Sequence, residues 1–494
     1  MADVKATVSL NAPHSGSQSV LFVDLDGTLI QTDLLWESLL LAVRRQPQIV
    51  WQLPAMLRRG IAFFKRVVAE RAMPDASQLP YREDVLEFIG QEKAAGTRVV
   101  LATGSDAACA QQVAKYLGVF DDVLASDGVT NLTGRRKRRA IQDYCEQHHF
   151  TEYGYIGDSR ADVPVWRKAA RVYCVAPSAG VLGAIRRHDQ IPSLVFGNSL
   201  ARWTPLLKVL RPQQWAKNAL LFVPLVLSHE LFNAPKLIAA VLAFVVFSLC
   251  ASSVYVLNDL FDMEDDRHHP QKRRRPFAAG TLPVRWGPPL TAALSATGLL
   301  IANLTLPGAF VGAVIGYLLL TTAYSFDLKR RTMLDVITLS GLYSLRIFAG
   351  GLTTGVVISE WLLMFSMFLF TSLAFVKRYA ELSRLAREGN ASARGRGYLV
   401  SDLSVIESMG TTSSYLAVLV MALYLKSDIA PTLYRQVWAL WLICPLLLYW
   451  VSRLWILAKR GSLCEDPVVF AMTDRVSLVV GACVVALLGI AVMP

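Results

Sequence analysis

The chain has 494 residues, and 53% of them are hydrophobic. This length is too great for one ordinary domain, and the mean hydropathy of +0.39 is too high for a wholly soluble protein. We therefore expect a membrane protein with a soluble part. A net charge of +12 is compatible with nucleic acid, anionic lipid or phosphorylated substrates as partners, so the positions of the basic residues must decide.

The N-terminal residues 1–18 are polar and are predicted to form a disordered lead-in. They lack the apolar stretch of a secretory signal, so we expect the first domain to lie in the cytosol. The seven cysteines of the chain show no CxxC pair or other metal-ligand spacing. They are predicted to be reduced residues with packing roles.

From Ser19 onward, short apolar runs alternate with helical patterns, which is typical of a parallel α/β sheet. The first run ends in Asp24-Leu25-Asp26-Gly27. Two acids at this position lie where open α/β sheets place their sites, although a simple turn rich in Asp and Gly has the same composition. Three later segments favour a functional site over a simple turn, because each supplies a polar side chain. They are Leu101–Ser105 with the hydroxyl of Thr103, Gly134–Lys137 with Lys137, and Gly157–Asp162 with the acid Asp158.

In this order, the four segments resemble the motifs of the haloacid dehalogenase (HAD) phosphatase superfamily, over roughly residues 19–180. The resemblance implies a Rossmannoid parallel sheet with a helical cap at about 30–76. It implies Asp24 as the nucleophile and Asp26 as the acid/base. It also implies Mg²⁺ on Asp24 and Asp158 with support from Asp162, and phosphate contacts from Thr103 and Lys137. The alternative is a catalytically inactive regulatory module.

The expected cap region mixes apolar residues such as Trp51 and Phe63 with basic residues such as Arg58 and Lys65. Such a basic amphipathic stretch either lies on a membrane or packs as a cap on its own core. The basic run Arg135–Arg139 has no interleaved aromatic residues and no nucleic-acid-binding motif, and its Lys137 already has a phosphate role. We therefore expect no nucleic-acid partner.

A polar linker at 191–204 separates the HAD-like domain, 19–190, from an all-α polytopic membrane domain at 205–494. The membrane domain holds about nine apolar segments that are candidates for transmembrane helices. They are 216–230, 236–257, 287–306, 309–326, 334–356, 360–376, 411–427, 436–458 and 476–493. Lys and Arg concentrate in alternate loops, which predicts that these loops and the HAD-like domain face the cytosol and the C-terminus lies opposite. The expected location is the inner (cytoplasmic) membrane of a bacterium.

The stretch Asn258–Gly280 combines acidic and basic residues at the end of an apolar run. In a helix, Asn258, Asp259, Asp262 and Asp266 would line one stripe roughly 12 Å long. Carboxylates in such a row suit Mg²⁺, and the Lys272–Arg275 run that follows supplies cations for phosphate. The stretch predicts a Mg²⁺–diphosphate site at a membrane surface.

This aspartate-rich motif and the pattern of about nine spans resemble the UbiA superfamily of intramembrane prenyltransferases. More narrowly, the chain is similar to the decaprenyl-phosphate phosphoribosyltransferase branch. The segments that carry this similarity are RPQQWAKN, NDLFDMEDDRHHPQKRRRP, YSFDLK with LDV, SLRIFAGG and EDPVVFAMTDR. The narrower resemblance implies Mg²⁺-dependent transfer of 5-phosphoribose from phosphoribosyl pyrophosphate to a polyprenyl phosphate.

One departure from the ordinary UbiA pattern supports the narrower resemblance. Where aromatic prenyltransferases carry a second DxxxD motif, this chain offers Tyr324, Lys329 and Asp335. A phosphoribosyltransferase must hold a pyrophosphate, a 5-phosphate and the phosphate of its acceptor together, so it needs more cations. The candidates are Lys217, Lys272, Arg275, Lys329, Arg346, Lys377 and Arg378.

We therefore predict a bifunctional enzyme in which the HAD-like domain dephosphorylates the phosphoribosyl lipid made by the membrane domain. A UbiA-type prenyltransferase acting on a prenyl diphosphate and an aromatic or other small acceptor is an alternative. A non-enzymatic lipid carrier or transporter with a regulatory HAD module is a second one. The sequence leaves the oligomeric state open, with a homo-oligomer as one option.

Overall fold

The computed structural model describes residues 19–188, 190–197, 203–269, 271–389, 397–463 and 466–493. The expected lead-in, 1–18, and part of the expected linker lie outside these residues. The chain divides into two compact units, one of residues 1–209 with 259–289 and the other of residues 210–258 with 290–494. The predicted domain bounds follow chain order, whereas this division assigns the aspartate-rich segment 259–289 to the N-terminal unit.

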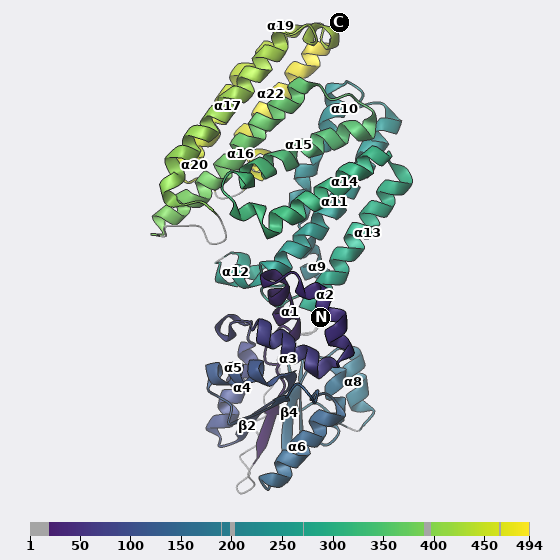
Figure 1. The fold of residues 1–494 in the computed structure, drawn as a ribbon, viewed down its shortest axis with the longest axis vertical. Helices are drawn as coiled ribbons and strands as arrows, with labels where there is room; N and C mark the ends of the chain where they lie inside the picture. Colours follow the sequence, from purple (N-terminus) through teal and green to yellow (C-terminus); the bar gives the residue numbers. More distant parts are fainter. Residues whose placement is uncertain are drawn as a thin grey trace, which may run out of the picture. The chain divides into compact units, whose positions relative to one another are not determined.

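A parallel sheet of six strands forms the centre of the N-terminal unit, with strand order β3-β2-β1-β4-β5-β6 (Figure 1). The strands are β1 (Val20–Val23), β2 (Arg98–Asp106), β3 (Asp122–Ser126), β4 (Tyr153–Gly157), β5 (Arg171–Val175) and β6 (Leu194–Phe196). Strand order reverses at β1, which pairs with both β2 and β4. Open α/β sheets bind their ligands at such a reversal, beyond the carboxyl ends of the strands.

Two apolar cores cover the two faces of this sheet, because every residue of β1 is buried and alternate residues point to opposite faces. Leu21 and Val23 pack with residues of α4 (Glu83–Ala94) and α5 (Ala107–Leu117). Val20 and Phe22 pack with residues of α6 (Arg135–Gln147), α7 (Val163–Trp166) and α8 (Ala179–Arg186). The predicted α/β sheet is confirmed.

Three helices between β1 and the next strand form the expected cap, namely α1 (Leu34–Arg45), α2 (Ile49–Arg58) and α3 (Ile61–Arg71). They share a core of their own, in which Ala42, Met56 and Phe64 are buried. Trp51 is 86% exposed. The cap therefore packs on its own core, and α2 also presents apolar and basic side chains outward. A short 3₁₀ helix, η1 (Ala76–Gln78), then α4 and β2 follow.

The segment 259–289 adds α12 (Met263–His268), η4 (Lys272–Arg274) and η5 (Val284–Trp286) to the N-terminal unit. The aspartate-rich motif is helical on both sides of a break at Asp262, so the stripe that an unbroken helix would form is interrupted there. The long helix α11 (Ala234–Phe261) ends before Asp262, which is in a turn, and α12 starts at Met263. Asp262 is a poor helix former, and the four acids between 262 and 266 repel one another. A break in the helix at this position therefore costs little free energy.

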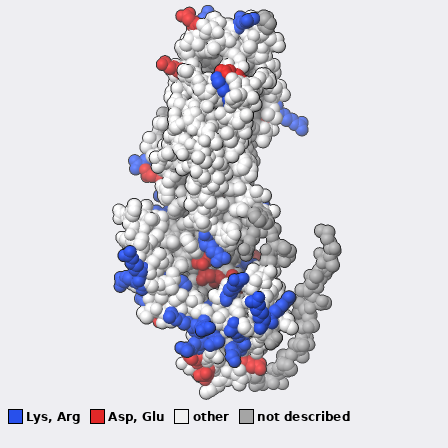
Figure 2. Space-filling model, turned by 90° about the vertical axis from the view of Figure 1, so that its right-hand side faces the viewer, with Lys and Arg blue, Asp and Glu red and all other residues white. Residues whose placement is uncertain are grey.

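The second unit is a bundle of helices (Figure 1). In chain order it contains η3 (Pro212–Phe222), α10 (Val223–Leu227), most of α11, α13 (Gly287–Thr305), α14 (Gly308–Phe326), η6 (Leu328–Arg330), α15 (Leu334–Thr354), α16 (Glu360–Arg387), η7 (Val400–Asp402), α17 (Leu403–Lys426), α18 (Ala430–Leu433), α19 (Val437–Trp441), α20 (Ile443–Lys459), α21 (Pro467–Thr473) and α22 (Arg475–Val492). The surface of the long helices is largely free of charged side chains on the face that Figure 2 shows.

Seven helical stretches among the described residues are long and apolar enough to cross a membrane. They correspond to seven of the nine predicted segments. The predicted segment 287–306 forms the 19-residue helix α13, and the predicted segment 216–230 forms η3 and the short α10. The chain is therefore an integral membrane protein with a helical membrane part, and the number of nine spans stays a prediction.

A close approach between α15 and η3 organises the interior of the bundle. A Cβ atom added to Gly350 would lie 2.1 Å from the carbonyl oxygen of Leu221. No other residue type fits there, because a side chain would collide with the backbone. This contact holds η3, and with it Lys217 and Asn218, against the face of α15 that carries Arg346.

Candidate active sites

Asp24 and Asp26 follow β1 directly, at the carboxyl edge of the sheet. An oxygen of Asp24 accepts a hydrogen bond from the Leu25 backbone N–H at 2.9 Å. One Asp26 oxygen accepts from the Leu34 N–H at 2.8 Å, and the other accepts from the Ser105 hydroxyl. Asp26 is therefore held between β2 and the first residue of the cap helix α1.

Lys137, at the start of α6, reaches the same edge. Its Nζ lies 2.9 Å from an Asp24 oxygen and 3.3 Å from an Asp162 oxygen. It also donates to the hydroxyl of Tyr155, which in turn donates to Asp162 at 2.6 Å. The Ser159 N–H and hydroxyl donate to the other Asp162 oxygen. Asp162 is thus oriented on both oxygens, as a residue supporting a metal site would be.

Three carboxylates converge in this site, and they suit a divalent cation. Asp24, Asp158 and Asp162 each offer an oxygen, and these oxygens lie within 4.8 Å of one another. Gly27 leaves room for this group, because its φ is +76° and a Cβ there would lie 2.5 Å from an Asp158 oxygen. Hard carboxylate oxygens are the ligands that Mg²⁺ prefers, so the residues fit the metal that HAD domains typically use.

Burial raises the pKa of all three aspartates that face the expected phosphate. It raises the pKa of Asp158 to about 8, with Asp162 and Asp24 adding to the effect. It raises the pKa of Asp24 to about 6, against the attraction of Lys137. Burial, with the charge of Asp33, raises the pKa of Asp26 to about 7. A pKa near neutrality suits Asp26 to give and take a proton.

Thr103 is fully buried in β2, and its hydroxyl accepts a hydrogen bond from the Ser105 N–H at 3.0 Å. The structure thus brings Asp24, Asp26, Asp158, Asp162, Thr103 and Lys137 to one edge of the sheet. Sequence reasoning missed Ser105 and Tyr155. Both lie within or beside the motifs that the sequence did single out, so closer reading of β2 and β4 could have found them.

Lys65 is a further residue at this edge, and it comes from the cap helix α3. Its Nζ donates to the Gly104 carbonyl at 2.6 Å and to the Asn131 side chain at 2.9 Å. Burial lowers the pKa of Lys65, while the charges of Asp26 and Asp33 oppose that change. The cap thereby brings a second ammonium group to the part of β2 that follows Thr103.

If this site hydrolyses a phosphate ester, we expect Lys65→Met to raise the KM for that substrate by about 10-fold or more, with a smaller change in kcat. A charge-assisted hydrogen bond contributes about 1.5–3 kcal/mol, and the Lys65 ammonium group lies beside Thr103, at the Gly104 carbonyl. Steady-state phosphate release would measure this. Lys115→Met is the matched control, because Lys115 lies on α5 and forms no ion pair in the described part of the chain. Equal KM values in both variants would contradict the role of Lys65.

The aspartate-rich segment forms a second polar site in the N-terminal unit. Asp259 and Asp266 are both buried, and one nitrogen of Arg275 lies 3.2 Å from the first and 2.6 Å from the second. Burial raises the pKa of Asp266 to about 6, and Arg275 limits the rise. Both carboxylates therefore converge on one cationic group. Asn258 and Asp262 are half-buried, and Lys272 is exposed.

The helical unit holds a lysine pair around an acid that sequence reasoning left out of its site. Lys217 of η3 and Lys377 of α16 lie 2.6 Å and 2.9 Å from the same oxygen of Asp466. Burial opposes the ionisation of Asp466, but the two ammonium groups outweigh it and hold its pKa well below the usual range. Asp466 also caps α21 through the Val468 N–H. Asp466 belongs to the sequence motif EDPVVFAMTDR, which could have indicated its role.

A second cluster surrounds Arg378. Asp335 is fully buried at the start of α15, and its oxygens contact the Arg378 guanidinium at 2.5 Å and the Tyr324 hydroxyl at 2.7 Å. Glu381 pairs with Arg378 from the next turn of α16. The charge of Arg378 is therefore balanced within the protein. Lys329 lies in η6, between the ends of α14 and α15, and is half-buried.

Arg346 differs from Arg378 in its partners. Its guanidinium donates to the Asn218 side chain at 2.9 Å, the Leu342 carbonyl at 2.6 Å and the Tyr317 hydroxyl at 3.1 Å. Within the part of the chain that the structure describes, these are neutral acceptors, and Arg346 forms no ion pair. A buried cation whose direct hydrogen-bond partners are all neutral is a candidate site for an anion. Asn218 and Tyr317 were missed by sequence reasoning.

Two family models match the chain over the regions just described. The UbiA prenyltransferase family model matches residues 219–487. The chain belongs to the UbiA prenyltransferase family. A haloacid dehalogenase-like hydrolase model matches residues 21–167. The UbiA part is therefore preceded by a HAD domain, and the two family resemblances seen in the sequence are confirmed.

Two relatives of the chain differ in how much of it they match. The protein y4nM of Sinorhizobium fredii is 35% identical over 94% of this chain and 89% of its own length. Decaprenyl-phosphate phosphoribosyltransferase of Mycobacterium tuberculosis (strain CDC 1551 / Oshkosh) is 32% identical over 58% of this chain and 94% of its own length. Among solved structures, a UbiA homologue from Archaeoglobus fulgidus bound to GPP and Mg²⁺ is 17% identical, with a TM-score of 0.44, over 58% of this chain and 99% of that chain.

Proposed function

We propose that the UbiA domain transfers 5-phosphoribose from phosphoribosyl pyrophosphate to a polyprenyl phosphate and releases pyrophosphate. The cations buried in the helical unit carry this proposal, above all Arg346 with its neutral partners. Similarity to decaprenyl-phosphate phosphoribosyltransferase over 94% of that protein's length supports the same activity.

The distribution of charge in the helical unit suits a reaction between several anions. Lys217 and Lys377 share Asp466, so an arriving phosphate can take over either lysine while Asp466 keeps the other. Arg346 can bind a phosphate without losing an ionic partner. A prenyltransferase with an uncharged acceptor needs to hold only one diphosphate, and it has less use for these groups.

In the proposed transfer, the phosphate oxygen of the acceptor lipid attacks C1 of the ribose as the bond from C1 to pyrophosphate breaks. The acceptor is already an anion, so no strong general base is needed. Tyr324, Lys329, Asp335 and Arg378 are the proposed phosphate-binding groups of the helical unit, and Lys272 and Arg275 are those of the aspartate-rich segment. Asn258, Asp259, Asp262 and Asp266 would hold Mg²⁺, which, when bound, offsets negative charge on the pyrophosphate.

We propose that the HAD domain then removes the 5-phosphate from the phosphoribosyl lipid. Asp24 would attack the phosphorus while Asp26 protonates the departing ribose oxygen, and Asp26 would then take a proton from the water that hydrolyses the aspartyl phosphate. Asp24, Asp158 and Asp162 would hold Mg²⁺, which shields the phosphate charge from the nucleophile when bound. Joining the two enzymes in one chain raises the local concentration of the second site.

The proposed location is the inner membrane of a bacterium, with the HAD domain and the basic loops in the cytosol and the C-terminus opposite. The concentration of Lys and Arg in alternate loops supports this orientation. Phosphoribosyl pyrophosphate is a water-soluble anion, so its site should open to the cytosol, while the lipid acceptor enters from the bilayer.

Family membership favours one competing function, the transfer of a prenyl group from a prenyl diphosphate to a small acceptor. Two reaction mixtures separate these activities. We expect purified protein with Mg²⁺ to release pyrophosphate from phosphoribosyl pyrophosphate and decaprenyl phosphate. We expect no release from geranyl diphosphate and an aromatic acid. Activity in the second mixture alone would contradict the proposed function.

A further inference from the structure

The cap helix α1 of the HAD domain carries a buried acid that phosphatase chemistry does not use. Glu37 is 3% exposed and lies in the first turn of α1. Both of its oxygens accept hydrogen bonds from Arg267 of α12, at 2.5 Å and 2.8 Å. The partner of this acid therefore lies in the aspartate-rich segment, 230 residues further along the chain.

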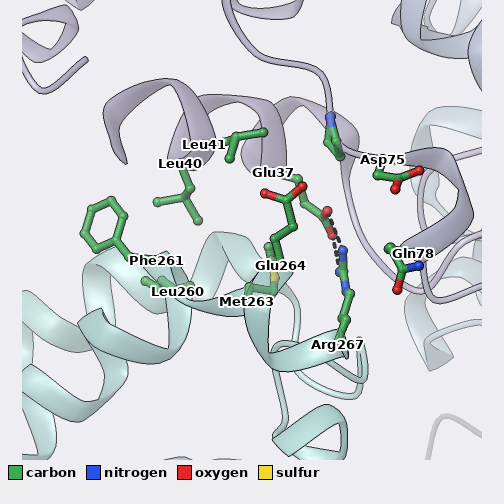
Figure 3. Close-up of a pocket in the computed structure, with 11 residues that line it drawn as sticks. Glu37, Leu40, Leu41, Asp75, Gln78, Leu260, Phe261, Met263, Glu264 and Arg267 are labelled. Carbon is green, nitrogen blue, oxygen red and sulfur yellow. Dashed lines mark hydrogen bonds and ion pairs between the residues drawn. The ribbon is translucent and has the colours of Figure 1, made fainter. Parts of the chain in front are cut away.

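Figure 3 shows this bidentate pair among the residues that line a cleft. The lining of the cleft includes Leu40 and Leu41 of α1 with Leu260, Phe261 and Met263 from the aspartate-rich segment. Side chains of this kind exclude water and lower the local dielectric, so the ion pair is stronger than it would be on the surface. Loss of either partner would leave an uncompensated buried charge.

Arg267 also contacts the loop that is expected to bind the donor. Its Nε donates to the Ala278 carbonyl at 3.0 Å, which closes the loop that contains Lys272 and Arg275. Arg267 also follows Asp266 directly, and Arg275 bridges Asp266 to Asp259. A shift of Arg267 would therefore move both the carboxylates and the basic loop that follows them.

A second contact between the same elements restrains the break in the helix. Arg44, in the last turn of α1, donates to the Phe261 carbonyl at 3.0 Å and pairs with Asp265 at 2.6 Å. The Phe261 carbonyl is the last of α11, where helix carbonyls need a partner from outside the helix. Two points of α1, about two turns apart, thus hold the segment on both sides of Asp262.

We propose that Glu37 is a positioning residue for the transferase reaction, acting through Arg267 to hold the aspartate-rich segment and its basic loop in their binding geometry. The HAD domain would then support transfer through its cap, independently of its own chemistry. This inference rests on the proposed role of the aspartate-rich segment in binding the donor.

The test compares Glu37→Gln with Glu70→Gln in the full-length protein. Glu70 is the matched control, since it forms an exposed ion pair with Arg66 on the cap helix α3. We expect Glu37→Gln to raise the KM for phosphoribosyl pyrophosphate and to lower transfer about 100-fold, because small misplacements of binding groups have effects of this size. Glu70→Gln should behave as the wild type.

Charge reversal distinguishes positioning from a loss of folding. We expect Arg267→Glu alone to impair transfer, and the double variant Glu37→Arg with Arg267→Glu to recover at least part of it. Hydrogen exchange should show faster exchange of backbone amides 262–280 in Glu37→Gln, and restored protection in the double variant. This second measurement needs no enzyme activity.

The outcomes separate this inference from the proposed function. Transfer by Glu37→Gln at the wild-type rate would overturn the positioning role, as would a loss of transfer with unchanged amide exchange. A wild-type protein that makes no phosphoribosyl lipid would overturn the proposed function instead. In that case, unchanged exchange at 262–280 in Glu37→Gln would also overturn the structural link.

Discussion

Asp24→Asn is expected to stop the release of inorganic phosphate from the phosphoribosyl lipid, by a factor on the order of 10⁴ or more, because the covalent route is lost. The phosphorylated lipid should then accumulate. Asn is close to Asp in size, but it cannot attack phosphorus as an anion. The measurement is the ratio of phosphorylated to dephosphorylated lipid by mass spectrometry, with free phosphate measured in the same mixture.

The control for this prediction is Asp143→Asn, which removes an exposed carboxylate from α6. This variant should form the phosphoribosyl lipid and release phosphate from it at the wild-type rates. Formation of phosphoribosyl lipid without phosphate release, in wild type and Asp24→Asn alike, would refute the proposed coupling. The HAD domain would then act on another substrate or as a regulatory module.

The aspartate cluster at the edge of the sheet was predictable because its residues follow the ends of neighbouring strands. Asp24 follows β1 and Asp158 follows β4, and these strands pair in parallel. Once the strands are recognised, their carboxyl ends must meet at one edge. Lys65 could not be placed in this way, because it reaches the site only through the packing of α3 within the cap.

The sequence indicates that the helical unit contains buried charged side chains, but it does not show which residues those side chains contact. A buried arginine in an apolar helix marks a polar interior wherever it occurs. The partners of Arg346 depend on how η3 meets α15 at Gly350, which no local pattern in the sequence reveals. Asp466 likewise acquires its role from two lysines that are distant in the chain. The contact between Glu37 and Arg267 likewise could not be predicted, because the two residues are far apart in the chain.

Arg346→Gln is expected to lower transfer about 100- to 1,000-fold while leaving the protein as stable as the wild type, or more so. A single preorganised donor to a reacting anion contributes a rate factor of about this size. Arg346 is buried among neutral acceptors, so folding gains no ion pair from its charge. Removing such a charge relieves a desolvation cost.

Arg378→Gln supplies the contrasting case, since it would leave Asp335 fully buried without its ionic partner. Breaking a buried pair in this way costs about 3–5 kcal/mol. We expect its thermal unfolding in detergent to shift downward by several degrees or more, whereas Arg346→Gln should not shift downward. If Arg346→Gln unfolded as early as Arg378→Gln, or transferred at the wild-type rate, Arg346 would be a structural residue and no anion site.

Titration of the two substrates then identifies the anion that Arg346 binds. A rise in KM for decaprenyl phosphate alone would assign Arg346 to the acceptor, and a rise for phosphoribosyl pyrophosphate alone would assign it to the donor. Arg346→Lys should recover part of the activity, because it restores the charge. It cannot reproduce three donors directed at Asn218, Leu342 and Tyr317, so we expect about 10-fold less transfer than in the wild type.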